Sequence, residues 1–165
     1  MNTYKLTLIA VLASLAVVGR LFFQFVPNVQ PVTSIIIICG FYLGPVSGIM
    51  LAFLSTYLSN LILGMGIWVV WQLVGWTLIG CISGWIGRFS FTYPLHLLIL
   101  FGICSGYMYG FIVSLANYSI AGKFWPYYLA GLPYDTYHAI GNGVFIAILF
   151  PVITKIFHRY RQNTN

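Results

Sequence analysis

Charge is scarce in this chain, and acidic charge is almost absent. Among 165 residues there are seven lysines and arginines and one acid, Asp135, so charged side chains make up only 5% of the sequence. A soluble domain has about 25% charged residues. Because 61% of the residues are hydrophobic, the chain cannot cover a surface that faces water. The sequence therefore predicts an integral membrane protein that uses lipid as its outer solvent.

The shortage of acids and of paired ligands also limits the chemistry. One carboxylate cannot supply the acid pair of an aspartyl protease or hold the Mg²⁺ ions of a phosphoryl-transfer enzyme. His96, His138 and His158 lie on separate segments, and the three cysteines stand singly without a CxxC spacing. The chain also lacks a GxxxxGK[ST] phosphate loop. We therefore expect no enzymatic activity, no metal site and no cofactor.

The cations indicate topology rather than a nucleic-acid partner. Lys5 lies near one end of the chain, and Lys155, Arg159 and Arg161 lie near the other. They form no basic face that could hold phosphates, so no nucleic acid is expected. The positive-inside rule places both ends of the chain on the cytoplasmic side of the membrane. This arrangement requires an even number of spans.

Continuous apolar runs, rather than the alternating segments of a β-barrel, predict helices. The run over residues 32–63 is interrupted by Gly44 and Pro45, and it is too long for one straight helix because a bilayer core needs about 20 residues. An even number of spans divides the run there. We expect a single all-α domain over residues 1–165, an integral membrane bundle of six transmembrane helices with both termini cytoplasmic. Its spans are placed at about 4–25, 33–43, 45–63, 68–87, 94–117 and 137–157.

Small residues predict where these helices pack. Glycines recur at every fourth position, as at Gly40, Gly44 and Gly48, and let helix backbones approach closely. The first span is expected to be a retained helix rather than a cleaved signal peptide. It carries small residues near its cytoplasmic end that can close the bundle or meet a partner protein. These residues are Ala10, Ala13 and Ser14.

Polar and indole side chains gather toward the outer half of the predicted bundle, although such groups are costly inside a membrane unless they are paired or functional. They come from several spans and from the loops between them. Together they predict a half-buried pocket for a flat polar ligand, in which tryptophans stack on a ring and amide and imidazole groups read its edge. The candidate residues are Asn28, Gln30, Thr33, Asn60, Trp68, Trp71, Gln72, Trp76, Asp135, His138 and Asn142.

Structural explanations stay open for individual members of this set. Tryptophans at this depth also anchor proteins at the lipid–water interface, and Asn28 and Gln30, between two prolines, can serve a tight turn. Asp135 can cap the start of a helix, or it can contact a ligand or an ion partner. Arg20 can pair with Asp135 or with lipid head groups. A membrane scaffold subunit, whose polar cluster only holds helices together, is therefore the alternative to a ligand-binding protein.

Several short motifs follow one another in a specific order. They are residues 18–20 (VGR), 27–33 (PNVQPVT), 58–60 (LSN), 63–68 (LGMGIW), 71–73 (WQL) with Trp76, and 132–142 (LPYDTYHAIGN). In this order and at this spacing, the chain resembles the substrate-binding S components of energy-coupling factor (ECF) vitamin transporters over nearly its whole length. The stretch at residues 66–71 (GIWVVW) departs from the family, in which we expect prolines or a threonine beside the tryptophans.

The resemblance implies a multi-pass protein of the bacterial plasma membrane that binds a vitamin outside the cell with high affinity. It implies as partners a membrane coupling protein, the T component, and two cytoplasmic ATPase subunits that hydrolyse ATP. In this family small residues of the first helix dock on the coupling protein, a role that falls here on Ala10, Ala13 and Ser14. Residues 28–33 and 64–71 would cover the ligand.

The expected cargo is a water-soluble vitamin or precursor with a small heteroaromatic ring, such as hydroxymethylpyrimidine or a pyridoxine-like compound. A single acid and few cations near the predicted pocket do not favour a highly anionic cargo such as folate. Cobalamin is the alternative, because the first-loop motif is similar to that of cobalamin carriers.

Overall fold

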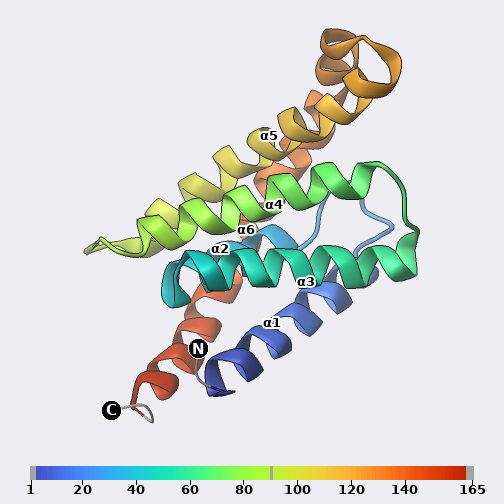
Figure 1. Ribbon diagram of the computed structural model, residues 1–165. Coiled ribbons are helices and arrows are strands. Elements are labelled where there is room, and N and C mark those ends of the chain that lie inside the picture. Colours follow the sequence, from blue (N-terminus) through green and yellow to red (C-terminus); the bar gives the residue numbers. More distant parts are fainter. Residues whose placement is uncertain (1–2, 90, 163–165) are drawn as a thin grey trace.

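The computed structural model describes residues 3–89 and 91–162, with side chains described as far as residue 157, and this part of the chain is helical without strands. The helices are α1 (Thr3–Phe22), α2 (Val32–Leu43), α3 (Pro45–Leu63), α4 (Trp68–Ile86), α5 (Pro94–Ala121) and α6 (Phe124–Gln162) (Figure 1). Five of them are long and apolar enough to cross a membrane, and α2 is a shorter apolar helix. The predicted all-α membrane bundle is confirmed.

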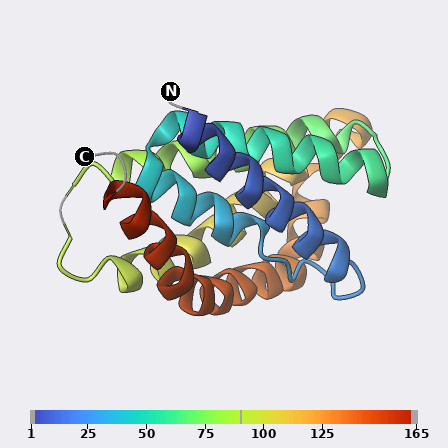
Figure 2. The same ribbon diagram turned by 90° about the horizontal axis from the view of Figure 1, so that it is seen from below.

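The short helix α2 forms the centre of the bundle. It packs against each of the five other helices, and Figure 2 shows it between α1 and α6. Every residue from position 31 to position 40 is buried. A helix that is apolar all round is stable in such a place because each of its faces meets another helix.

Gly44 separates α2 from α3, as the sequence predicts. Its φ of 88° lies in a region that favours glycine, and Pro45 then occupies the first turn of α3, where a missing N–H costs nothing. The Lys5 ammonium group donates to the Leu43 carbonyl at 2.7 Å. A cation at this position complements the negative end of the α2 dipole.

Glycines bring the backbones of α2, α3 and α4 into contact. A Cβ placed on Gly80 would lie 2.7 Å from the carbonyl oxygen of Gly48, and one placed on Gly40 would lie 2.7 Å from the carbonyl oxygen of Gly80. No side chain fits at these distances without a shift of the backbone. The packing role predicted for the repeated glycines is therefore confirmed at this crossing.

The last two helices differ from the expected spans. The fifth and sixth spans were expected at about 94–117 and 137–157 with a loop between them, but α5 continues to Ala121 and α6 begins at Phe124 rather than near residue 137. Rings pack across this hairpin, with Phe111 at 5.1 Å from Phe124 and 5.6 Å from Tyr128 between centroids. A neighbouring helix therefore supports the α6 backbone even though Pro133 lies inside it. The positions of the six spans within a bilayer stay a prediction.

Different helix ends and connections lie at the two ends of the bundle. The start of α1, the end of α6, the α2–α3 turn and the end of α4 lie at one end, as an even number of spans requires (Figures 1 and 2). Residues 23–31 and 64–67, which connect α1 to α2 and α3 to α4, lie at the other end. We call this second end the outer end, because the charge pattern predicts that it faces away from the cytoplasm.

Candidate functional site

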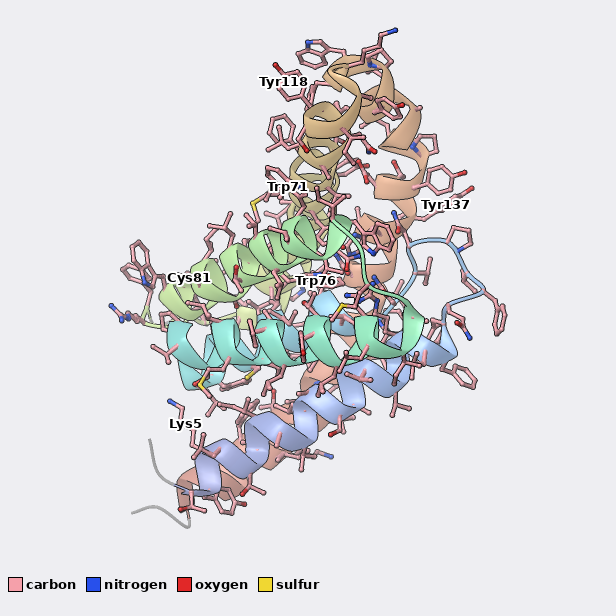
Figure 3. The ribbon with its side chains drawn as sticks, turned by 45° about the vertical axis from the view of Figure 1, so that its right-hand side comes forward. Lys5, Trp71, Trp76, Cys81, Tyr118 and Tyr137 are labelled. Atoms are coloured by element: carbon pink, nitrogen blue, oxygen red, sulfur yellow. The ribbon has the colours of Figure 1, made fainter. Side chains whose placement is uncertain are left out.

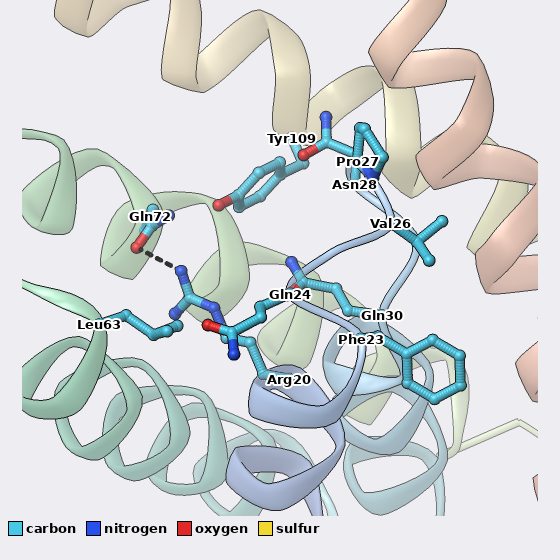
Figure 4. Close-up of a pocket in the computed structure, with 10 residues that line it drawn as sticks. All are labelled: Arg20, Phe23, Gln24, Val26, Pro27, Asn28, Gln30, Leu63, Gln72 and Tyr109. Carbon is cyan, nitrogen blue, oxygen red and sulfur yellow. Dashed lines mark hydrogen bonds between the residues drawn. The ribbon is translucent and has the colours of Figure 1, made fainter.

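A polar cavity of about 350 Å³ lies at the outer end, and we call it the first lobe. Residues from α1, the 23–31 connection, α3, α4 and α5 surround it (Figure 4). Its lining consists of Arg20, Phe23, Gln24, Val26, Pro27, Asn28, Gln30, Leu63, Gln72 and Tyr109.

A second lobe of about 310 Å³ continues between α5 and α6. Asn28, Gln72 and Tyr109 line both lobes, so the two adjoin, and we call them together the outer cavity. The other residues of the second lobe are Gly110, Val113, Ser114, Asn117, Tyr127, Gly131, Tyr134 and Asp135.

Arg20 is held in the first lobe by neutral groups. Its side chain is only 8% exposed, and it donates to Ser59 Oγ at 2.7 Å and to Gln72 Oε1 at 3.3 Å. Its guanidinium carbon lies 5.0 Å from the centre of the Trp76 ring, which is a favourable cation–π distance. In the described part of the chain no ion pair joins Arg20 to Asp135. The expected pairing of these two residues is therefore wrong, and Arg20 lies inside the bundle rather than among lipid head groups.

A buried layer of aromatic and hydroxyl groups supports the cavity. The Trp76 indole N–H donates to Thr33 Oγ1 at 2.9 Å, and the same hydroxyl lies 2.9 Å from His138 Nε2. Tyr109 stacks on Trp76 with 4.9 Å between ring centroids and meets the His138 ring edge to face at 5.0 Å. These contacts fix the Tyr109 ring at the floor of both lobes, and Figure 4 shows its hydroxyl directed toward Gln72.

Gln72 connects the cavity to α3. Its Oε1 accepts a hydrogen bond from Asn60 Nδ2 at 2.9 Å, and Asn60 Nδ2 also donates to the Thr56 carbonyl at 2.8 Å. Asn60 is 1% exposed and lines neither lobe, so it orients Gln72 from behind. The side-chain oxygen of Gln72 is thereby occupied by Asn60 and Arg20.

Asp135 lies in the interior of α6, because that helix begins at Phe124. It therefore cannot cap the helix, which was one of its expected roles. The side chain is 4% exposed, and its Oδ2 atom is buried without a hydrogen-bond partner. Gly110 of α5 faces it so closely that a Cβ at position 110 would overlap the carboxyl group. The absence of a side chain at Gly110 makes room for the carboxyl group, whose Oδ2 atom has no hydrogen-bond partner.

The structure separates the predicted site residues into four groups. Asn28, Gln30, Gln72 and Asp135 line the outer cavity, and Thr33, Asn60, Trp76 and His138 lie in the layer behind it. Asn142 lies deeper, where its Nδ2 donates to the Gly102 carbonyl at 3.0 Å. Trp68 and Trp71 line neither lobe, and Trp68 is 47% exposed.

Helix geometry explains the different places of the tryptophans. Trp71 and Trp76 are five positions apart, which is about 140° around a helix of 3.6 residues per turn. Figure 3 shows both on α4, but only Trp76 is fully buried. The pattern of indole groups therefore predicted the correct helix but not the face that reaches the cavity.

Two important lining residues are absent from the predicted set. Arg20 was expected to pair with Asp135 or with lipid head groups rather than to line a cavity, and Tyr109 lies within a predicted apolar run. Tyr109 shares a helix face with Gly102, Ser105 and Gly106, which lie seven, four and three positions before it. These three residues are buried, and that face of small residues is the signal that places Tyr109 toward the interior.

The described residues contain no group of three or more His, Cys, Asp or Glu side chains that could hold a metal ion. The outer cavity instead presents hydrogen-bonding groups and aromatic rings, among them Tyr109 in both lobes, which suit reversible binding of a small polar molecule. Such pockets have volumes of about 300–1,000 Å³.

The small residues of α1 divide between two faces. Ala10 and Ser14 are exposed, whereas Ala13 is 1% exposed and faces the bundle. Ser14 Oγ donates to the Ala10 carbonyl at 2.9 Å, so its hydroxyl is satisfied within the helix. Of the three predicted docking residues, Ala10 and Ser14 are therefore available to a partner, and Ala13 is not.

The family model described as "ECF transporter, substrate-specific component" matches residues 4–158. A search of curated proteins finds no match, and neither does a search of solved structures.

Proposed function

Because the chain belongs to the family of ECF transporter substrate-specific components, whose model matches residues 4–158, we propose that its outer cavity binds a water-soluble vitamin or vitamin precursor with high affinity for import. A protein of this family is a multi-pass membrane protein and the substrate-binding subunit of an ECF importer. It is not itself an ATPase, and it works with a T component and with ATPase subunits.

One observation carries the proposed ligand site: polar side chains from four helices and a connection surround the Tyr109 ring at the outer end. Stacking on such a ring contributes about 0.5–1.5 kcal/mol beyond the area that is buried. The lobes of about 350 and 310 Å³ suit a molecule with one small ring. We propose hydroxymethylpyrimidine or a pyridoxine-like compound as the cargo.

The transport cycle we propose assigns separate tasks to separate surfaces. Residues 23–31 supply much of the wall of the first lobe, so binding would order this connection over the cargo, together with residues 64–67. Ala10 and Ser14 on the exposed side of α1 would dock on the T component in the bacterial plasma membrane. The bundle would then tip through the bilayer, and ATP hydrolysis by the two ATPase partners would reset it.

Low charge favours this movement. Each lysine or arginine at the centre of a bilayer costs about 2.5–3.5 kcal/mol on insertion scales. Arg20 is buried inside the bundle, so it would move with the protein rather than face lipid.

The test is a ligand titration of the purified protein in detergent, in which intrinsic tryptophan fluorescence reports binding. The panel contains hydroxymethylpyrimidine, pyridoxine, thiamine and cobalamin. We expect a saturable change in the submicromolar range for hydroxymethylpyrimidine or pyridoxine. Gln72→Ala should abolish this change, and Trp68→Phe, outside both lobes, should retain it.

Two other results would replace this proposal. Binding of cobalamin alone would identify a cobalamin carrier whose 23–31 connection moves aside for a large ligand. A well-folded protein that responds to no member of the panel would favour a membrane scaffold subunit, in which the polar groups only hold the helices together.

A further inference from the structure

Two buried charges of opposite sign line the outer cavity, and neither has a charged partner in the described part of the chain. Arg20 is 8% exposed and contacts only neutral groups, those of Ser59, Gln72 and Trp76. Asp135 is 4% exposed, and its Oδ2 has no hydrogen-bond partner. A buried charge is costly unless another group compensates it. Among the described residues, Arg20 thus has neutral partners but no counter-charge, whereas the Asp135 carboxylate lacks both.

The two charges lie in different lobes. Arg20 lines the first lobe and Asp135 the second, while Tyr109, Gln72 and Asn28 line both. The residues that line the second lobe include no lysine, arginine or histidine, so no cationic side chain stands beside the carboxylate there. The outer cavity thus presents a positive group in one lobe and a negative group in the other, and Tyr109 lines both lobes.

The surroundings of Asp135 show that its carboxylate is not a structural pairing group. It lies in the interior of α6, where it caps no helix, and Gly110 provides the space that it fills. The next polar residue on this face, His138, is turned to Thr33 instead. Asp135 lines the second lobe with more than nine-tenths of its surface buried, and the unpartnered oxygen of its carboxyl group points to a ligand group that donates a hydrogen bond.

We propose that the cargo is a dipolar nitrogen heteroaromatic that spans both lobes, with an amino group or protonated ring nitrogen on Asp135 and an oxygen acceptor on Arg20. This inference rests on the proposed function and specifies the chemistry of its ligand. The ring lies against Tyr109, and the dipole of the ligand is aligned with the field between the two side chains, with its positive end at Asp135 and its negative end at Arg20. Complementary charges of this kind determine specificity, because an analogue with an acceptor in place of the donor would meet the carboxylate directly.

The experiment compares two probes that differ in one group. Hydroxymethylpyrimidine carries an exocyclic amino group, and its deaminated analogue carries a carbonyl oxygen at that position. Calorimetric titration is performed with wild-type protein, with Asp135→Asn and with the control Trp68→Phe. We expect the wild-type protein and Trp68→Phe to prefer the amino compound at least tenfold, and Asp135→Asn to lose most of this preference.

A second measurement needs no cargo. If the carboxylate is reserved for a ligand, the melting temperature of unliganded Asp135→Asn should equal or exceed that of the wild-type protein. A lower melting temperature would assign Asp135 a structural role and overturn the inference.

The outcomes also separate this inference from the proposed function. Binding of both probes with equal affinity, or an equal loss for both in Asp135→Asn, would overturn the inference and leave a heteroaromatic carrier. Binding of neither probe by the wild-type protein would overturn the inference and the proposed pyrimidine cargo, and a response to pyridoxine or another vitamin in the fluorescence panel would still support a carrier.

Discussion

Gln72→Leu is the substitution that tests the cavity wall most sharply, because Gln72 serves two buried donors. Its Oε1 accepts from Asn60 Nδ2 at 2.9 Å and from Arg20 Nη2 at 3.3 Å. Leucine has nearly the same size but no acceptor. Asn60 is 1% exposed, so one of its N–H groups would lose its partner, at a cost of about 1–3 kcal/mol. Arg20 lines the cavity, where water can replace its lost bond, so its contribution is small.

We therefore expect Gln72→Leu to lower the free energy of unfolding by about 1–3 kcal/mol and to weaken ligand binding. Gln72→Glu is the matched control, because it keeps an acceptor for both donors and places a negative charge beside Arg20. Thermal unfolding in detergent should show a lower melting temperature for the leucine variant and an equal or higher one for the glutamate variant. Equal melting temperatures for Gln72→Leu and the wild-type protein would refute the reasoning.

Two further predictions concern helix packing and docking. Gly80→Val adds a branched side chain where a Cβ would already lie 2.7 Å from the Gly48 carbonyl oxygen. Thermal unfolding should therefore show that the variant is less stable by about 1–3 kcal/mol, the usual cost of overpacking. An unchanged melting temperature would contradict the backbone contact. Ser14→Trp should stop uptake in cells that contain the partner subunits yet leave the affinity of the purified protein intact, whereas Ala13→Trp, at a buried position, should lower the melting temperature. Loss of both uptake and affinity in Ser14→Trp would show that docking and binding are not separate.

Much of the fold could be predicted because lipid imposes simple limits on the sequence. Charge at the two chain ends required an even number of spans, and Gly44 with Pro45 marked the place where a long apolar run divides. The extent of α6 could not be predicted in the same way. Gly122, Pro126, Gly131 and Pro133 are typical of a loop, but α5 packs against this segment, which is helical from Phe124 onward.

The sequence predicted which segments contribute to the site but not which face of each helix turns toward the cavity. Polar residues such as Asn28, Gln72 and Asp135 are costly in a membrane, which drew attention to them, and the structure places them around one cavity. Aromatic residues are common in lipid-facing positions as well as in interiors, so their presence alone did not separate Trp71 from Trp76. For the same reason the sequence alone did not identify Tyr109 as a cavity residue.

Native mass spectrometry of the protein, purified in detergent from vitamin-replete cells, tests the central claim most directly. The account predicts a one-to-one complex with a small nitrogen heteroaromatic that is retained by Trp68→Phe and lost in Gln72→Ala. Folded wild-type protein that carries only lipid in repeated preparations, and that takes up no compound when hydroxymethylpyrimidine and pyridoxine are added, would contradict the claim that the outer cavity is a vitamin-binding site.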